Sequence, residues 1–496
     1  MKNLLIAVPQ LEIHRPPVST AMISGIMKAN GHDVKCLDLN IKMYHEWGKE
    51  KYYAYRNVWE KMRVPTEHEK TSINDFIKIH LLPHCSNDTR LLISVFTFNS
   101  QVFTKLACEL VLDKYPECEI ILGGVGLSDG FGPLMLELNL CKYVIYGEGE
   151  EALISLLNGN ADHPGINNEH NLKQVNDLNT TAFPDYNDVN FNSYEYLFKN
   201  RREVNIVGSR GCVRKCTYCD VPALWPKFRY RSGQNIADEM INYYEKYGVN
   251  QFYFTDSLIN GSLKAFRDMC DKLANYNTTN QDGFKWGGQL IFKQQKTVTD
   301  DYFDMIVAAG GDQFYVGVET GSDKIRWEMD KKFTNEDIDH HLYHFNRVGL
   351  KCVFLMIIGY VTETLQDHHD NLAMYARWQK YVATGTINGI DLSTSLTFLP
   401  NTPLERMIGS HGIEFPVNQV DAAGNPVSNR LIWTSKTNPD LTFEERIRRR
   451  LEVHEKAIEY KWPIWRGPQR LESIKGHVEQ YKYGTARVMP VFETLN

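Results

Sequence analysis

The feature that most constrains the fold is a series of alternating strand-like and helix-like segments between residues 203 and 399. Apolar runs rich in β-branched and aromatic residues alternate with segments whose apolar residues recur at helical spacing. The expected strands are 203–209, 251–255, 284–291, 313–318, 352–358 and 390–399, and the expected helices are 235–248, 262–275, 300–310, 334–349 and 367–383. Thr334 and Asp337 form a predicted capping box. This order predicts parallel βα units, in a barrel or an open α/β sheet, with ligands at the carboxyl ends of the strands.

The N-terminal third is expected to be a second α/β unit with a doubly wound sheet. Its expected strands are 4–8, 33–39, 90–98, 119–124 and 143–150, and its expected helices are 19–31 and 101–116. Residues 40–89 interrupt this pattern with aromatic residues interleaved among charges. The sequence leaves open whether they form a substrate lid or a solvated helical insertion.

These patterns predict four parts: a doubly wound, Rossmann-like domain over 1–157, a linker over 158–200, a partial (β/α)6 barrel over 201–400 and a small, mainly helical region over 401–496. Residues 444–462 are expected to form a charged helix. Its Arg-rich run, 446–450, is interpreted as a basic contact patch or, as is more usual, a solvated face.

Composition and apolar runs limit the compartment and the partners. The net charge of −6 argues against a general nucleic-acid binder. The first apolar run, 4–8, is too short for a signal peptide, and the longest, 352–358, falls far short of the ~20 residues that a membrane span needs. We therefore expect a cytoplasmic protein, in which clustered thiols more often bind metal than form disulfides.

Three cysteines, Cys212, Cys216 and Cys219, lie within eight residues, directly after the first expected strand of the barrel. Thiolates suit zinc or iron–sulfur clusters, but a structural zinc site takes four ligands, usually as two pairs, and no second CxxC occurs. The nearest histidines, His170 and His340, are far along the chain. An electron-transfer cluster needs four cysteines, and the fourth is missing. The spacing therefore favours a 4Fe–4S cluster with one open iron, with zinc and electron transfer as alternatives.

The stretch "SRGCVRKCTYC" resembles the cluster loop of the radical S-adenosylmethionine superfamily, whose pattern is CxxxCxΦC with an aromatic residue at Φ, here Tyr218. The resemblance implies that Cys212, Cys216 and Cys219 hold a 4Fe–4S cluster and that the open iron is chelated by S-adenosylmethionine. It also implies reductive cleavage to a 5′-deoxyadenosyl radical that abstracts a substrate hydrogen, and an electron donor such as flavodoxin or ferredoxin.

Later strand ends resemble the same superfamily. "FYFTDSLIN" places Asp256 where paired acidic residues are common, although Ser257 replaces the second, and "VGVETGSDK" carries Glu319 and Ser322. The resemblance implies that Tyr218, Asp256, Glu319 and Ser322 bind S-adenosylmethionine. "IIGYVTET" resembles a "GLPGET" segment in which residues 360–362 replace Leu-Pro-Gly.

The N-terminal order "PPVSTAMISGIMKANGHDVKCLDL … GGVG … VIYGEGEEAL" resembles the cobalamin-binding domain that precedes the radical barrel in one large class. It implies a cobalamin site at Gly123, Gly124, Gly126, Gly147 and Glu148, with the corrin close to the backbone, so that side chains at Gly124 or Gly126 would displace it while the fold survives at modest cost.

No Asp-x-His-x-x-Gly occurs, so no histidine is expected as the lower cobalt ligand. With cobalamin, the expected reaction is methyl transfer to an unactivated carbon. Without it, the expected reaction is a radical rearrangement, dehydrogenation or cyclisation. No motif identifies the substrate.

Overall fold

The computed structural model describes residues 1–465 except 56–64, 129, 171–172, 199–200, 280–282, 416, 421–425, 429 and 431. The chain divides into two compact units, Met1–Asn205 and the part that begins at Ile206. Within the described residues, no helix is both long enough and apolar enough to span a membrane.

The N-terminal unit is built on a parallel five-stranded sheet of order β2-β1-β3-β4-β5. This order confirms the predicted doubly wound arrangement, in which the direction of winding reverses between β1 and β3. The strands read as nearly continuous apolar runs because both faces of the sheet are covered. Their bounds are β1 (Lys2–Ala7), β2 (Lys35–Asp38), β3 (Thr89–Ser94), β4 (Glu119–Gly123) and β5 (Tyr143–Ile145).

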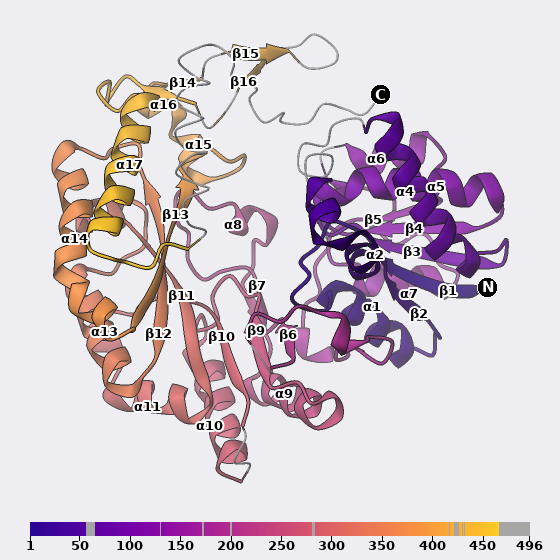
Figure 1. Ribbon diagram of the computed structural model, residues 1–496, viewed down its shortest axis with the longest axis horizontal. Coiled ribbons are helices and arrows are strands. Elements are labelled where there is room, and N and C mark those ends of the chain that lie inside the picture. Colours follow the sequence, from indigo (N-terminus) through magenta and orange to yellow (C-terminus); the bar gives the residue numbers. More distant parts are fainter. Residues whose placement is uncertain are drawn as a thin grey trace. The chain divides into compact units, whose positions relative to one another are not determined.

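Helices cover both faces of this sheet, and each face has its own apolar core (Figure 1). Successive side chains of a strand point to opposite faces, so Leu4 and Ile6 belong to one core and Leu5 to the other. The helices are α1 (Val18–Ala29), α2 (Leu39–Ala54), α4 (Glu67–His80), α5 (Gln101–Lys114), α6 (Phe131–Glu137) and α7 (Gly149–Leu157), with the 3₁₀ turns η1 (Leu82–His84), η2 (Phe98–Ser100) and η3 (Val125–Leu127).

The described part of the 40–89 segment is neither a lid nor a solvated insertion. Its helices α2 and α4 contribute Tyr44, Tyr52, Ile73 and Phe76 to the larger core of the N-terminal unit. Tyr44, Tyr52 and Phe76 are thus on the inner faces of two covering helices, whereas Tyr53 is 36% exposed. Residues 56–64 lie outside the described part.

The segment after α7 packs on the N-terminal unit through much of its length. Ile166 forms an antiparallel bridge with Ile145 of β5, and Asp185 accepts a bond from Lys28 of α1 at 2.5 Å. Tyr194 donates to Asp38 at the end of β2. The segment contains the 3₁₀ turns η4 (Leu178–Thr180) and η5 (Phe191–Ser193).

The second unit is built on a six-stranded sheet of order β13-β12-β11-β10-β9-β6. The strands are neighbours in the order in which they occur in the chain, and the described pairs from β9 to β13 are parallel. The strands are β6 (Glu203–Ile206), β9 (Gln251–Phe254), β10 (Lys285–Leu290), β11 (Gly311–Glu319), β12 (Lys351–Ile358) and β13 (Ile387–Ser395), and the connecting helices are α9 (Gly233–Tyr247), α10 (Leu263–Thr279), α11 (Asp300–Ala308), α13 (Asn335–Val348) and α14 (Leu365–Ala383). All six predicted strands and all five predicted helices are present.

The helices cover one face of this sheet, as expected for a partial barrel (Figure 1). Buried and more exposed side chains alternate along β9 and β10. Phe252, Phe254 and Trp286 are buried, whereas Tyr253 is half-buried and Gln289 is exposed. The predicted capping box of Thr334 and Asp337 begins α13.

The chain beyond β13 is partly helical, with short strands. Its elements are α15 (Pro403–Arg406), α16 (Ile408–His411), β14 (Ile413–Glu414), β15 (Val417–Val420), β16 (Pro426–Ser428), β17 (Thr434–Ser435) and α17 (Phe443–Glu459), and the smaller elements of the barrel are β7 (Ser209–Arg210), α8 (Val221–Leu224), β8 (Arg229–Tyr230), η6 (Gln295–Thr297) and α12 (Asp323–Glu328).

The arginine run of α17 corrects both interpretations made from the sequence. Arg446, Arg449 and Arg450 are buried, and only Arg448 forms exposed ion pairs, with Glu445 and Glu452. Three of these arginines therefore hold α17 in place rather than forming a solvated face or a contact patch.

Candidate functional site

Cys212, Cys216 and Cys219 lie in the loop that follows β6 and β7, at the carboxyl end of the six-stranded sheet. Cys216 is buried and the other two are half-buried. Burial raises the pKa of the Cys219 thiol to about 11, and the charges of Cys216 and Cys212 also raise it. The three thiols are therefore close enough to influence one another.

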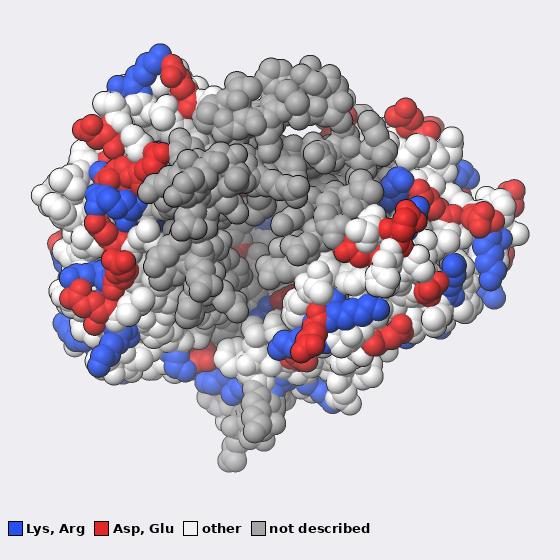
Figure 2. Space-filling model, turned by 45° about the horizontal axis from the view of Figure 1, so that its top comes forward, with Lys and Arg blue, Asp and Glu red and all other residues white. Residues whose placement is uncertain are grey.

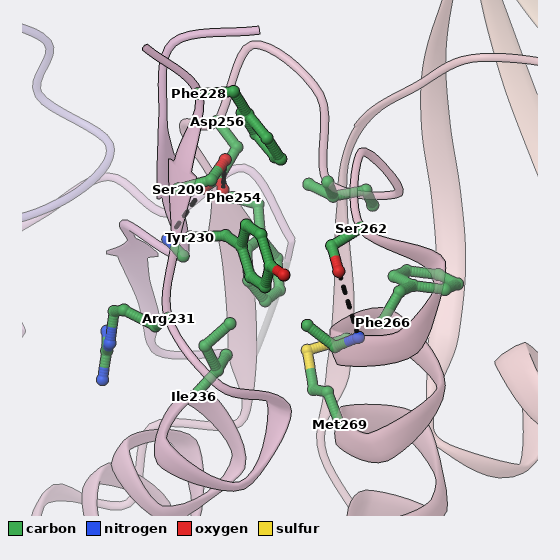
Figure 3. A pocket seen from close by; sticks show the side chains of 13 residues that line it. Ser209, Phe228, Tyr230, Arg231, Ile236, Phe254, Asp256, Ser262, Phe266 and Met269 are labelled. Atoms are coloured by element: carbon green, nitrogen blue, oxygen red, sulfur yellow. Dashed lines mark hydrogen bonds between the residues drawn. The ribbon is translucent and has the colours of Figure 1, made fainter. Parts of the chain in front are cut away.

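The beginning of this loop is held by Asp256, which follows β9. Its carboxylate accepts hydrogen bonds from the Gly208 backbone N–H at 2.9 Å and from the Ser209 hydroxyl (Figure 3). Burial raises the pKa of Asp256 to about 6, against the effect of these two bonds. Together with the rings of Phe228 and Tyr230, the carboxylate lines a cavity of about 20 Å³, enough for one water molecule.

The middle of the loop is held at Thr217. Its backbone N–H donates to the Met329 carbonyl at 3.2 Å, and its own carbonyl accepts from the Leu404 N–H at 2.8 Å. Its hydroxyl bonds to the hydroxyl of Tyr360, which lies just after β12, at 2.7 Å. The loop is thus anchored by segments that follow β9, α12, β12 and β13.

The surroundings of the thiols fit an anionic iron–sulfur cluster. The backbone N–H of Arg214 donates to the Cys212 sulfur at 3.4 Å. Hydrogen bonds of this kind adjust the potential of thiolate-held clusters. Burial raises the pKa of Cys216, whereas the positive charge of Lys331 acts in the opposite direction.

Among the described residues, no three histidine, cysteine or carboxylate side chains gather closely enough to bind a single metal ion. A 4Fe–4S cluster does not need such convergence, because each thiolate binds a different iron.

Glu319, at the end of β11, lies beside these thiols. Its carboxylate accepts from the Lys331 ammonium at 2.8 Å, and both side chains are more than nine-tenths buried. Although burial lowers the pKa of Lys331, the charge of Glu319 and then that of Cys216 raise it above its ordinary value. Burial, followed by the charge of Glu319, raises the pKa of Tyr218 well above its ordinary value. The structure therefore brings Tyr218 and Glu319 together with Cys216 and Cys219.

The backbone around this pair is strained. Glu319 has φ +67°, and Asp330 and Lys332, on either side of Lys331, have φ +62° and +54°. Residues other than glycine rarely adopt this left-handed backbone conformation. Such strain persists only where the surrounding structure enforces it, often at functional sites.

The structure gives Asp256 and Ser322 other contacts. Asp256 bonds to the start of the cysteine loop, through Gly208 and Ser209. Ser322 begins α12 by accepting from the Ile325 N–H, and its hydroxyl donates to Asp367 at 2.7 Å. Their proposed contacts with S-adenosylmethionine remain predictions.

The predicted cobalamin residues lie at the carboxyl edge of the N-terminal sheet. Gly123 ends β4, Gly124 and Gly126 follow it, and Gly147 and Glu148 follow β5. Glu148 accepts from the Val175 N–H at 2.7 Å, which ties it to the segment after α7.

The expectation that the fold tolerates side chains at Gly124 and Gly126 is wrong. A Cβ atom on Gly124 would lie 2.4 Å from the Val95 carbonyl oxygen, and one on Gly126 would lie 2.5 Å from the Thr97 carbonyl oxygen. These glycines therefore pack against the backbone that follows β3. Only Gly123 of the three is open, with no atom nearer than 4.0 Å to a Cβ built there.

Sequence motifs do not identify Arg214 and Lys331 as residues of the cysteine-loop site, nor the anchoring role of Thr217 and Tyr360. Tyr360 was visible only as a departure from the "GLPGET" pattern. Lys331 lies twelve residues from its partner Glu319, and a lysine near the end of a helix has no distinctive local pattern.

Charges of both signs intersperse over the described part of the face shown in Figure 2. On that part of the surface, no extended patch carries positive charge alone, as a nucleic-acid-binding surface does. This agrees with the net charge of −6.

Residues 206–373 match the Radical SAM superfamily. Among curated relatives, the chain is 24% identical over 201 residues to cytidylyl-2-hydroxyethylphosphonate methyltransferase of Streptomyces wedmorensis, covering 38% of this chain and 36% of that protein. It is 23% identical over 292 residues to anaerobic magnesium-protoporphyrin IX monomethyl ester cyclase of Cereibacter sphaeroides, covering 55% and 42%. The matches thus span less than half of these relatives.

Solved structures share the fold over almost the whole chain. The radical S-adenosylmethionine methyltransferase TsrM of Kitasatospora setae, with cobalamin and a [4Fe-4S] cluster bound, superposes with a TM-score of 0.60 at 16% identity, covering 91% of this chain and 89% of that one. The cobalamin-dependent radical enzyme OxsB, with aqua-cobalamin bound, gives 0.64 at 17% identity, covering 97% and 71%. The chain therefore has the fold of cobalamin-dependent radical S-adenosylmethionine enzymes.

Proposed function

We propose that this chain, whose residues 206–373 form a radical SAM domain, is an enzyme that cleaves S-adenosylmethionine reductively and transfers a methyl group with the help of cobalamin. Cys212, Cys216 and Cys219 hold the 4Fe–4S cluster. The cluster supplies the electron for cleavage and cobalamin carries the methyl group, while the protein positions the reactants and excludes water.

The observation that carries this proposal is the anchoring of the cysteine loop. Three thiols emerge from one loop at the carboxyl end of a parallel sheet, where α/β proteins bind their ligands. Bonds from Asp256 and from Thr217 to other segments hold the beginning and the middle of this loop. Such rigidity is what a cluster with only three protein ligands requires.

Glu319 and Lys331 shape the pocket beside the open iron. In this proposal the Glu319 carboxylate accepts hydrogen bonds from hydroxyl or amino groups of S-adenosylmethionine. Lys331 holds that carboxylate in position, and its own charge stabilises the thiolate of Cys216.

Cobalamin is proposed to lie at the carboxyl edge of the N-terminal sheet. Two apolar side chains are exposed there: Phe96, which follows β3, is 49% exposed, and Val125, which follows β4, is 51% exposed. Neighbouring apolar side chains at a ligand-binding edge suit the face of a large planar cofactor.

The proposed setting is a reducing compartment, the cytoplasm, with a flavodoxin or ferredoxin as electron donor. All ten cysteines are free, as is usual for proteins of such compartments.

Anaerobic reconstitution with iron, sulfide and hydroxocobalamin tests the proposal. We expect about four irons per chain, formation of 5′-deoxyadenosine from S-adenosylmethionine, and cobalamin retained through gel filtration with a spectrum that lacks a histidine ligand. Cys216→Ala should lose the cluster, whereas Cys270→Ala, in α10, should load iron normally. Full iron loading in Cys216→Ala would refute the cluster assignment. A colourless protein with an intact cluster would replace methyl transfer by a cobalamin-free radical reaction.

A further inference from the structure

Three aromatic rings form a row on the face of the six-stranded sheet that lies opposite the helices. Phe314 of β11 points toward the helices, because its ring centroid lies 6.0 Å from that of Phe345 in α13. The next residue, Tyr315, points to the opposite face, since successive side chains of a strand alternate. Its ring centroid lies 5.8 Å from that of Tyr253 in β9 and 5.1 Å from that of Trp465. Tyr253, Tyr315 and Trp465 are called the aromatic row below.

Backbone hydrogen bonds hold Trp465 in this row. Its N–H donates to the Ile390 carbonyl of β13 at 2.9 Å, and the Ile390 N–H donates to the Pro463 carbonyl at 2.9 Å. The segment after α17 therefore runs parallel to β13 along the edge of the sheet. A Cβ atom built on Gly389 would lie 3.4 Å from the Trp465 ring, so this ring rests on a position of β13 that has no side chain.

The aromatic row and the neighbouring residue Gln289 are accessible to solvent. Trp465 is 36% exposed, and the other two rings are half-buried. Gln289 of β10 is in register with Tyr315 and is exposed, although β10 is an inner strand of the sheet. The residues on either side of it, Gly288 and Leu290, are buried. A small molecule can therefore reach ring surface and a side-chain amide at the same place.

The aromatic row adjoins the proposed cofactor pocket. A Cβ atom built on Gly317 would lie 2.3 Å from Oε1 of Glu319 and 2.6 Å from Nζ of Lys331. Gly317 faces the same side of the sheet as Tyr315, two residues earlier and therefore about 7 Å along β11. The buried ion pair thus lies over this face, next to the row. A molecule that rests on the row is adjacent to the carboxylate that is proposed to bind S-adenosylmethionine, which is where a substrate has to lie.

We propose that the aromatic row and Gln289 bind a planar heteroaromatic group of the substrate. This inference rests on the proposed function, since it names the substrate class for the same barrel. Tyr253 and Trp465 lie on opposite sides of β11, so the ring surface is extended and suits the face of a flat ring rather than a compact cation enclosed in an aromatic cage. The Gln289 amide offers one acceptor and two donor hydrogens to the polar edge of that ring.

Calorimetric titration of the anaerobically reconstituted full-length protein with the bicyclic aromatic lactam carbostyril tests the inference. The protein is saturated with S-adenosylmethionine and no reductant is added. We expect saturable binding of carbostyril and none of valerolactam, which has the same lactam edge without an aromatic ring. Trp465→Ala and Gln289→Leu should each weaken binding at least tenfold, which corresponds to about 1.4 kcal/mol.

Two further variants separate loss of the site from loss of the fold. Trp465→Phe keeps a ring and should retain binding of carbostyril. Trp327→Ala removes a tryptophan of α12 that is 56% exposed, and it is the matched control, with unchanged binding expected.

Three results would overturn the inference: no saturable binding of carbostyril to the wild-type protein, binding by Trp465→Ala and Gln289→Leu equal to that of the wild type, or binding only when S-adenosylmethionine is absent, which would assign the aromatic row to the adenine ring of the cofactor. Iron content and formation of 5′-deoxyadenosine with a reductant, measured on the wild-type protein, report the proposed function separately. Normal values of both without binding of carbostyril reject the aromatic site alone, and loss of both rejects the proposed function.

Discussion

At the scale of single residues, the ion pair of Glu319 and Lys331 contributes both to stability and to the proposed cofactor pocket. Their ion pair is buried beside Cys216 in a strained stretch of backbone. Removing one partner leaves the other charge buried and unpaired, which typically destabilises a protein by about 3–5 kcal/mol.

Glu319→Ala is therefore expected to lower the free energy of unfolding by about 3–5 kcal/mol while the cluster still assembles, and to weaken binding of S-adenosylmethionine at least tenfold. Urea unfolding and anaerobic titration calorimetry measure the two effects. The double variant Glu319→Ala/Lys331→Met is the control: it should regain stability but not cofactor affinity. An unchanged dissociation constant in Glu319→Ala would exclude Glu319 as a cofactor ligand.

Asp256 makes the free energy of unfolding depend on pH. Burial raises the pKa of its carboxyl group from 3.8 to about 6, so the folded state retains this proton over a range in which the unfolded state has lost it. The contribution of Asp256 to the free energy of unfolding is greatest below about pH 4. It decreases by roughly 1.4 kcal/mol per pH unit as the pH rises to about 6.

Asp256→Asn cannot ionise, and its single oxygen can accept only one of the two hydrogen bonds, because Gly208 and Ser209 donate to different oxygens of Asp256. Relative to the wild type, its free energy of unfolding should therefore rise by roughly 3 kcal/mol between about pH 4 and pH 7. Urea unfolding at a series of pH values measures this difference, and a difference that does not vary with pH would contradict it.

At the scale of elements, α17 is fixed by buried charged contacts in addition to its apolar ones. Arg449 pairs with Glu363 at 3.1 Å, and both side chains are buried. Glu363 also accepts from the Gly359 N–H at 2.9 Å, so the pair joins α17 to the turn after β12. That turn includes Tyr360, which anchors the cysteine loop.

Arg449→Ala should therefore lower the free energy of unfolding by about 3–5 kcal/mol, because Glu363 is left buried without its cation. The neighbouring residue Arg448, whose ion pairs are exposed, is the matched control: Arg448→Ala should change stability by about 1 kcal/mol or less. Urea unfolding measures both variants, and equal effects would show that burial of the pair does not determine its contribution.

At the scale of the whole molecule, the two units have separate apolar cores, and the proposed cofactors are held by residues of different units. Val125→Ser should reduce retention of hydroxocobalamin without loss of iron. Leu138→Ser, at the opposite edge of the same sheet and 46% exposed, is the control and should retain the pigment.

Conversely, replacing Cys212, Cys216 and Cys219 together with Ala should abolish iron loading and preserve cobalamin. Gel filtration followed by absorption spectra and iron analysis measures both losses, and joint loss in either variant would contradict separate sites.

The sequence by itself determined the elements and their class. Helical and strand periodicities are local properties, so they were sufficient to predict both sheets, the capping box at Thr334 and the loop that carries Cys212, Cys216 and Cys219. The doubly wound order of β1 to β5 followed from the alternation of strands and helices.

Only the tertiary structure decided which charges meet. Glu319 and Lys331 are separated by 12 residues and Glu363 and Arg449 by 86, and periodicity carries no information about such distances. The arginine run of α17 was misread for the same reason, because a charged helix looks solvated until its buried partners are known. The glycines after β4 likewise revealed their role only when the backbone of Val95 and Thr97 was found packed against them, since a close approach between remote backbones leaves no local pattern.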